Sequence, residues 1–140
     1  MLDEGLNRFG KVGIDTNIFI YHFYSNPEFG PLVKNLFAQL EEGKITGITS
    51  TITITELLGF SDTKTNLDLL EARFLTTPNL SIFDVSQHIA LTGAEIRREY
   101  GFRTPDAIQL ATAKIGRAEA FITNDAGFKK FKELEVILLT

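Results

Sequence analysis

Apolar residues in this sequence form two alternating patterns: short runs rich in β-branched residues, and longer stretches with helical periodicity. The short runs predict five strands, at residues 12–15, 45–49, 80–85, 118–123 and 136–139. The longer stretches lie between them, so that strands and helices alternate along most of the chain. This alternation is typical of βαβ units, in which the strands are parallel and helices cover the sheet.

Four helices are predicted from apolar residues that recur on one face and from residues that start or stop a helix. The first has its apolar face at Leu32, Val33, Leu36, Phe37 and Leu40 and ends at Gly43. The second is capped by Asp62 or Thr63, has its apolar face at Leu67, Leu70 and Phe74, and ends before Pro78. The third is capped by Ser86 and has its apolar face at Ile89, Ile96 and Tyr100, and the fourth has its apolar face at Ile108, Ala111 and Ile115. The last helix is expected to have Thr104 as its N-cap and Pro105 at its first position. A shorter helix is expected over residues 126–131.

Residues 50–59 fit either a strand or a helix. Their β-branched residues alternate, as in a strand, but Ser50 is a good N-cap. A strand placed directly after the preceding one would also leave no room for a turn. The sequence therefore predicts a strand that ends at about Thr49 and a helix that begins at about Thr51.

The chain is expected to form one domain over residues 1–140, with five strands and with helices on both faces of the sheet. A length of 140 residues suits a single core, and no repeat or Gly/Ser-rich linker marks a boundary. Hydrophobic residues make up 44% of the chain and charged residues 23%, which is typical of a globular protein.

Composition removes several classes of site. The chain has no cysteine, which excludes disulfides, thiolate metal sites and cysteine nucleophiles and agrees with a cytoplasmic location. The start of the chain lacks the pattern of a signal peptide, and no apolar run approaches the ~20 residues of a membrane-spanning helix. The formal net charge is −4, so a phosphate-rich ligand would need a local basic patch or a metal ion.

Four acidic residues are candidates for one site. Asp15 and Asp125 directly follow predicted strands, Asp106 begins a helix, and Glu56 lies one to two turns into the helix after the second strand. The carboxyl ends of parallel strands form the ligand crevice of open α/β sheets, so the four side chains are expected at one edge. Each also has a structural interpretation: a turn for Asp15, an N-cap for Asp125, the helix dipole for Asp106 and an exposed helix position for Glu56.

Four carboxylates in one crevice are electrostatically costly. Two carboxylates ~5 Å apart repel by roughly 3 kcal/mol at an effective dielectric constant of ~20. The group would therefore raise its pKa values or bind a cation, and ligands of oxygen alone suit Mg²⁺ or Mn²⁺. A hard cation in such a crevice is typical of phosphate-ester hydrolysis, in which the metal activates a water molecule.

The motifs Ile14-Asp15-Thr16-Asn17, Thr55-Glu56-Leu57, Thr104-Pro105-Asp106-Ala107-Ile108 with Ala111, and Thr123-Asn124-Asp125-Ala126-Gly127-Phe128 resemble the signature of PIN domains. The match is strongest to the small VapC-type toxins and runs from about Val12 to Leu138. It implies a three-layer α/β/α PIN-like fold with a central, mostly parallel five-stranded sheet. It also implies Mg²⁺- or Mn²⁺-dependent endoribonuclease activity, with the four acids as the site and Asp15 and Asp106 as its first metal ligands.

The resemblance carries further expectations. Thr123 matches a hydroxyl residue that supports the acidic site, and Asn17 matches a polar residue that orients the first Asp. Proteins of this kind are usually homodimers, and they are typically blocked by an antitoxin that inserts a basic residue into the crevice. RNA is the implied substrate, and membership of a type II toxin–antitoxin pair is the implied setting.

Basic and aromatic residues offer weaker candidates. Arg97, Arg98 and Arg103 are candidates for holding the RNA backbone near Asp106, although each also fits a solvated helix face. The cluster Lys129, Lys130 and Lys132 is a poorer candidate for the same role. His22 and His88 lie in no ligand motif. Phe19, Phe23 and Tyr24 are expected in the core, with a dimer or partner surface as the other interpretation.

Two other functions compete with the nuclease. A phosphohydrolase that uses Asp15 as a covalent nucleophile would favour a second carboxylate two residues later, but Asn17 stands there. A non-catalytic PIN-like module that binds RNA or protein is the second alternative. The intact set of four acids argues against it, because a scaffold gains nothing from a repulsive cluster.

Overall fold

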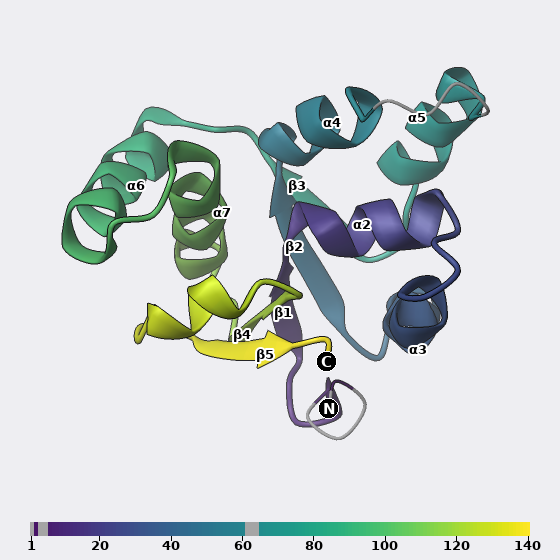
Figure 1. The fold of residues 1–140 in the computed structure, drawn as a ribbon, viewed down its shortest axis with the longest axis horizontal. Helices are drawn as coiled ribbons and strands as arrows, with labels where there is room; N and C mark the ends of the chain where they lie inside the picture. Colours follow the sequence, from purple (N-terminus) through teal and green to yellow (C-terminus); the bar gives the residue numbers. More distant parts are fainter. Residues whose placement is uncertain (1, 3–5, 61–64) are drawn as a thin grey trace.

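The computed structural model describes residues 2, 6–60 and 65–140, which form a five-stranded sheet between two layers of helices (Figure 1). The strand order is β3-β2-β1-β4-β5, and every neighbouring pair is parallel. The strands are β1 (Lys11–Ile14), β2 (Thr46–Ser50), β3 (Leu80–Phe83), β4 (Ala120–Thr123) and β5 (Glu135–Leu138). The three-layer fold and the parallel sheet expected from the sequence are confirmed.

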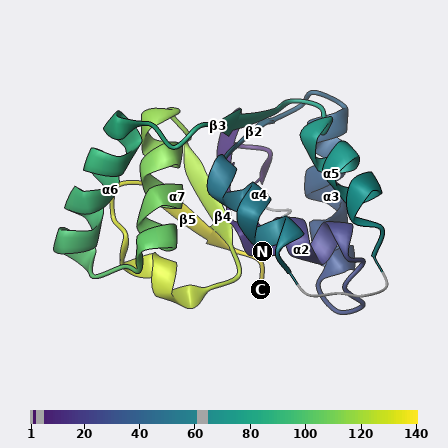
Figure 2. The same ribbon diagram turned by 90° about the horizontal axis from the view of Figure 1, so that it is seen from above.

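Helices cover both faces of the sheet (Figure 2). One face carries α2 (Thr16–Phe23), α3 (Gly30–Glu41), α4 (Thr51–Leu58) and α5 (Leu67–Leu75). The other carries α6 (Gln87–Tyr100), α7 (Thr104–Ile115) and the short 3-10 helix η1 (Ala126–Lys130). None of the helices in the described ranges is both long and apolar enough to cross a membrane.

Alternate residues of the central strands pack into two separate cores. Val12 and Ile14 of β1 lie in the core beneath α2, α3 and α5, whereas Phe121 of β4 lies in the core beneath α6 and α7. Gly13 faces α7 so closely that a Cβ atom there would lie 2.7 Å from the Cβ of Ala113. This contact holds α7, which carries Asp106, tightly against the central strand.

The order of the strands places two of the acidic residues at a topological switch point. From β1 the chain moves outward through β2 and β3, and it then returns to the other side of β1 as β4. Loops that leave β1 and β4 therefore diverge at the carboxyl edge, where open α/β sheets bind their ligands. Asp15 follows β1 and Asp125 follows β4.

Two local predictions differ from the structure. Helix α2 was not predicted: it is short and rich in β-branched and aromatic residues, and it is stabilised by burial of Ile18, Phe19 and Phe23. In α7 the N-cap is Arg103 rather than Thr104, so Pro105 stands one position later than expected. The Thr104 hydroxyl accepts a hydrogen bond from Arg97, and no side chain caps the start of the helix.

The other boundaries agree with the expectations within a few residues. The segment 50–59 is helical from Thr51 with Ser50 as its N-cap, and α6 is capped by Ser86, both as predicted. The cap expected at Asp62 or Thr63 lies outside the described residues, and the N-cap of α5 is Asn66. Phe19 and Phe23 are buried, which confirms the expected core positions.

A candidate active site of four carboxylates

Asp15 is the most enclosed of the four candidate acids. It follows the central strand, its backbone N–H donates to Ile122 O at 2.9 Å, and its side chain caps α2 by accepting from Thr16 N at 2.9 Å. Only 7% of the residue is exposed. The structural interpretation as a turn or cap is therefore correct, but it accounts for one carboxylate oxygen and leaves the other for further contacts.

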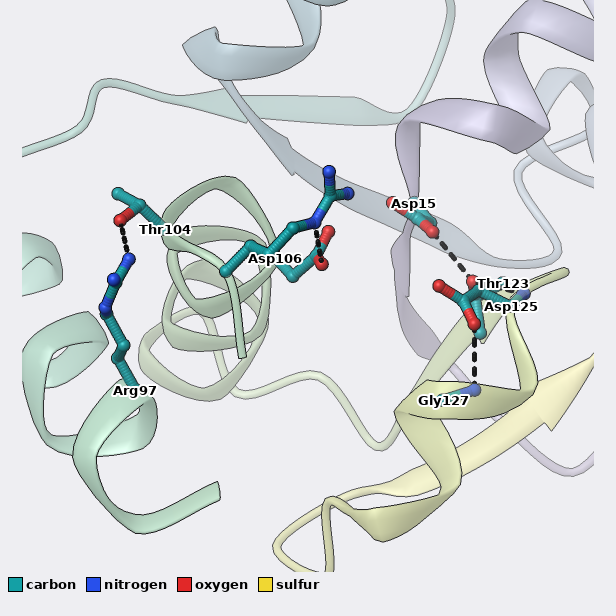
Figure 3. Close-up of polar contacts among 8 residues, drawn as sticks. Asp15, Arg97, Thr104, Asp106, Thr123, Asp125 and Gly127 are labelled. Atoms are coloured by element: carbon teal, nitrogen blue, oxygen red, sulfur yellow. Dashed lines mark hydrogen bonds and ion pairs between the residues drawn. The ribbon is translucent and has the colours of Figure 1, made fainter. Parts of the chain in front are cut away.

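Thr123, at the end of β4, supports the second oxygen of Asp15. Its buried hydroxyl donates to Asp15 Oδ2 at 2.7 Å and accepts from Asp125 N at 3.1 Å (Figure 3). One side chain thus links the two acidic loops. Asn17 is exposed, and within the described ranges it makes no hydrogen bond to Asp15, whose orientation comes from Thr16 and Thr123.

The carboxylate of Glu56 is held by a hydrogen bond from Thr16, the residue that follows Asp15. The Thr16 hydroxyl donates to Glu56 Oε1 at 2.7 Å, and the same oxygen of Thr16 accepts from Gln109 Nε2 at 3.1 Å. Gln109 also donates to Thr53 Oγ1 at 2.7 Å, and its carbonyl accepts from Ser50 Oγ at 3.0 Å. A buried polar network therefore joins α2, α4 and α7 behind the carboxylates.

Sequence reasoning missed Gln109 and this network. A usable signal existed, because Gln109 is a polar residue three positions after Asp106, among residues of α7 that are mostly apolar and buried. Among the described residues, every buried side-chain nitrogen and oxygen has a hydrogen-bond partner. The network is therefore fully satisfied, which makes the removal of any member costly.

Replacing Gln109 with leucine should destabilise the protein by about 1–3 kcal/mol, because it leaves buried hydroxyl groups without partners. Urea unfolding measures the change. Gln39 is the matched control: it is also buried, with 8% exposure against 3% for Gln109, and among the described residues its side-chain amide makes a long hydrogen bond of 3.4 Å to Asn7. Gln39→Leu should lose less than Gln109→Leu, and an equal or larger loss would contradict the role of the network.

Asp106 and Asp125 complete the cleft from two other elements. Asp106 lies in the first turn of α7, projects toward the side that carries Asp15 and Asp125 (Figure 3), and pairs with Arg103 Nε at 3.3 Å. Asp125 is the N-cap of η1 and accepts from Gly127 N at 2.8 Å. Four acids that are distant in sequence therefore reach one place from four elements.

All four side chains line a single open cleft of about 500 Å³. The other residues of its wall are Thr16, Asn17, Ile20, Gly59, Phe60, Arg103 and Phe128. Burial is the main cause that raises the pKa of Asp15 to about 6; hydrogen bonds from Thr123 and Thr16 oppose the shift, and the charges of Asp106 and Glu56 add to it. Asp106 and Glu56 are thus close enough to repel the charged form of Asp15.

The donor set suits a hard divalent cation, since it consists of carboxylate oxygens alone. In the part of the chain that the structure describes, however, no three such side chains are grouped tightly enough to hold an ion together. Each acid instead has its own protein partner, and Asp106 has the Arg103 guanidinium. A cation bound at these acids would compete with Arg103 for the carboxylate of Asp106.

The three candidate arginines lie in different surroundings. Arg103 is 81% exposed and lines the cleft. Arg97 donates to Thr104 at the start of α7, and Arg98 is exposed in the last turn of α6. Lys130 lies over the Phe102 ring at 4.5 Å, beside the same α6–α7 corner. Only Arg103 therefore meets the acids directly.

The histidines lie outside the cleft. His22 stacks on Phe37 with ring centroids 3.8 Å apart, and burial, together with the charge of Arg73, lowers its pKa to about 4. His88 is exposed in α6. Neither residue lines the acidic cleft, which agrees with the expectation that they do not serve as ligands there.

Comparison with known proteins gives a consistent picture. The family model described as PIN domain matches residues 12–134. Ribonuclease VapC2 from Methanocaldococcus jannaschii is 27% identical over an alignment of 142 positions, gaps included, that covers 91% of this chain and 93% of the relative.

Solved structures share the fold. VapBC2 from Rickettsia felis, bound to a DNA fragment from its promoter, has a TM-score of 0.71 at 23% identity, over 91% of this chain and 98% of that one. A toxin–antitoxin complex from Klebsiella pneumoniae has a TM-score of 0.65 at 26% identity, over 94% and 98%. DNA-bound VapBC from Salmonella typhimurium has a TM-score of 0.68 at 18% identity, also over 94% and 98%.

Proposed function

The chain belongs to the PIN-domain family, and from that premise we propose that it is a divalent-metal-dependent endoribonuclease, the toxin of a type II toxin–antitoxin pair. The observation that carries the proposal is the convergence of Asp15, Glu56, Asp106 and Asp125 on one cleft. The name of the similar ribonuclease from Methanocaldococcus jannaschii supports the reaction. Its test is RNA cleavage that requires a divalent cation and is lost when one of these acids is removed.

Asp15 and Asp106 would be the first ligands of the cation, Mg²⁺ or Mn²⁺, with Glu56 and Asp125 completing the set. A bound divalent cation would lower the pKa of a water molecule and stabilise negative charge on the phosphate. Thr123 holds one oxygen of Asp15 in place, and Thr16 does the same for Glu56. These hydrogen bonds fix the carboxylates before any ligand arrives, so little reorganisation is needed there.

Arg103 is suited to hold the RNA backbone next to the acids. Its guanidinium is exposed and its Nε is the atom within reach of Asp106, so its other N–H groups could donate hydrogen bonds to a phosphate. If a cation held the carboxylate of Asp106, Arg103 would pair with the substrate alone. Arg97 and Arg98, at the end of α6, would extend the same basic flank.

The burial of Asp15 gives the metal-free protein a pH-dependent stability. Its pKa rises from an ordinary value of 3.8 to about 6, so the folded state binds a proton more tightly than the unfolded chain. The free energy of unfolding should therefore decrease as the pH rises from about 4 to about 6, by up to about 3 kcal/mol from this group.

Urea unfolding in EDTA at pH 4.5 and 7.5 isolates the contribution of Asp15 when the wild type is compared with Asp15→Asn. The variant should lack this decrease, whereas the other carboxylates titrate alike in both proteins. Identical pH dependence in the two proteins would show that Asp15 is not desolvated as described.

We also infer a protein partner and self-association. Two of the similar solved structures are of VapBC proteins and a third is a toxin–antitoxin complex, which supports a cognate antitoxin. Helix α5 exposes apolar side chains that a partner or a second copy can cover, at Leu67, Leu69 and Leu75. Light scattering of the purified chain tests the homodimer directly.

A further inference from the structure

One large apolar side chain stands exposed at the rim of the acidic cleft. Phe60 is 45% exposed and lines the cleft, whereas the other exposed large hydrophobic residues of the described chain lie on α5 or α6 and do not. Exposure of an aromatic ring to water forgoes the free energy that its burial would contribute. A ligand that enters the cleft would meet this ring.

The ring of Phe60 is held in place from behind. Tyr24 contacts it edge-on, with ring centroids 4.9 Å apart and an interplanar angle of 61°. The Tyr24 hydroxyl lies 2.9 Å from Leu57 O and 3.3 Å from Phe60 O, which ties it to the end of α4. One side of the Phe60 ring is therefore supported, and its exposed part is presented as a fixed surface.

Phe60 also shares the cleft wall with the acids. It follows Glu56 by four residues and lies two positions after α4 ends at Leu58. Gly59 between them places no side chain in the cleft wall. The ring thus flanks the carboxylates on the α4 side, while Arg103 flanks them on the α7 side.

The charge of the cleft explains why a ring is useful there. Four acids face one cation, Arg103, in the cleft wall, and the whole chain has a formal charge of −4. Charge alone therefore gives little attraction for RNA. Stacking of a base on an aromatic side chain does not depend on charge and contributes about 1–3 kcal/mol for each base.

We propose that Phe60 is a substrate-positioning residue that stacks against an unpaired base of the RNA beside the phosphate held at the carboxylates. The proposal rests on the proposed ribonuclease function and deepens it. It assigns the α4 side of the cleft to a base and the α7 side to the backbone. A base that stacks on Phe60 must have left its own stack, so duplex RNA cannot use this contact.

A fluorescence experiment tests the contact directly, because the chain contains no tryptophan. Phe60→Trp introduces a single reporter at the rim, and combining it with Asp15→Asn keeps the RNA intact in Mg²⁺. A single-stranded RNA oligonucleotide of mixed sequence should quench this fluorescence, whereas inorganic phosphate and the same oligonucleotide in a duplex should not. Leu91→Trp, in the same background, is the matched control, since Leu91 is 68% exposed on α6.

The affinity for RNA provides a second test. In the Asp15→Asn background, Phe60→Ala should weaken binding of the labelled oligonucleotide on the order of tenfold in fluorescence anisotropy, and Phe60→Tyr should restore it. Because the ring is exposed, Phe60→Ala should keep the thermal unfolding midpoint close to that of its parent. In active enzyme the same change should raise KM more than it lowers kcat.

The outcomes separate this inference from the function on which it rests. RNA that binds in anisotropy without quenching the tryptophan at position 60, or that binds Phe60→Ala as tightly as its parent, overturns the role of Phe60 and leaves the nuclease intact. RNA that neither binds nor is cleaved by any form of the protein overturns the proposed function and, with it, this inference.

Discussion

Asp15→Asn is expected to reduce RNA cleavage by about a thousandfold or more. The substitution removes the negative charge from the most buried carboxylate of the cleft, and that charge is what would hold a divalent cation there. Metal-assisted stabilisation of the transition state contributes several kcal/mol, and about 4 kcal/mol corresponds to a factor of a thousand in rate. Initial rates of cleavage of an end-labelled RNA in Mg²⁺ measure the loss.

The same substitution should make the protein more stable at neutral pH. The folded protein carries the Asp15 charge against its preference for the protonated form, so asparagine should add about 1–3 kcal/mol to the free energy of unfolding. The lower part of this range allows for a poorer hydrogen bond with Thr123. If Asp15→Asn gains stability and loses activity, Asp15 serves as a metal ligand and not only as a structural cap.

Asp84 provides the matched control for this prediction. It directly follows β3 at the same edge of the sheet, but it is exposed and does not line the cleft. Asp84→Asn should leave both cleavage and stability close to the wild type. If Asp15→Asn instead fails to fold while Asp84→Asn is normal, Asp15 is required as the cap of α2 and its assignment as a ligand is wrong.

Asp106→Asn should lower cleavage by at least a hundredfold with little effect on the fold. Asp106 is not the N-cap of α7, and its ion pair with the exposed Arg103 is solvated. Such pairs, and an acid in the first turn of a helix, each stabilise by about 1 kcal/mol or less. Cation binding measured by calorimetry should weaken in parallel with the rate.

The two variants should therefore differ in stability while they agree in activity. Asp15→Asn is expected to raise the free energy of unfolding and Asp106→Asn to lower it slightly. Normal cleavage by Asp106→Asn would remove α7 from the proposed site and leave the pairing with Arg103 as its only role. Weaker cation binding with an unchanged rate would show that the cation serves structure rather than the reaction.

Much of the fold was predictable because the three central strands, β2, β1 and β4, are almost entirely buried and the strands read as short runs rich in apolar or β-branched residues. The helix that starts at Thr51 was predictable from the cap at Ser50, although its β-branched residues suit a strand. Helix α2 was not predictable, because it is apolar on most sides and its low intrinsic propensity is overcome by packing between the sheet and α3. Tertiary contacts determine the conformation of such a segment, and they cannot be predicted from the local sequence.

The candidate acids were predictable for a different reason. Each stands at a recognisable place, after a strand or near the start of a helix, and parallel strands bring those places to one edge. The polar residue Gln109 on the buried side of α7 was a usable signal that was missed, but its partner Thr16 was not predictable, because the two meet across 93 residues of sequence. The ion pair of Arg103 with Asp106 was equally hidden, since it depends on side-chain orientation at the start of α7.

Cleavage of a mixed, end-labelled RNA pool by the wild type and by Asp15→Asn, in Mg²⁺, Mn²⁺ and EDTA, tests the proposed function most directly. We predict cleavage by the wild type in either cation, none in EDTA, and none by the variant. Cleavage that persists in EDTA or in the variant would contradict a carboxylate-held cation. A wild type that cleaves no RNA and binds no cation would contradict the enzyme itself and favour a non-catalytic module of the same fold.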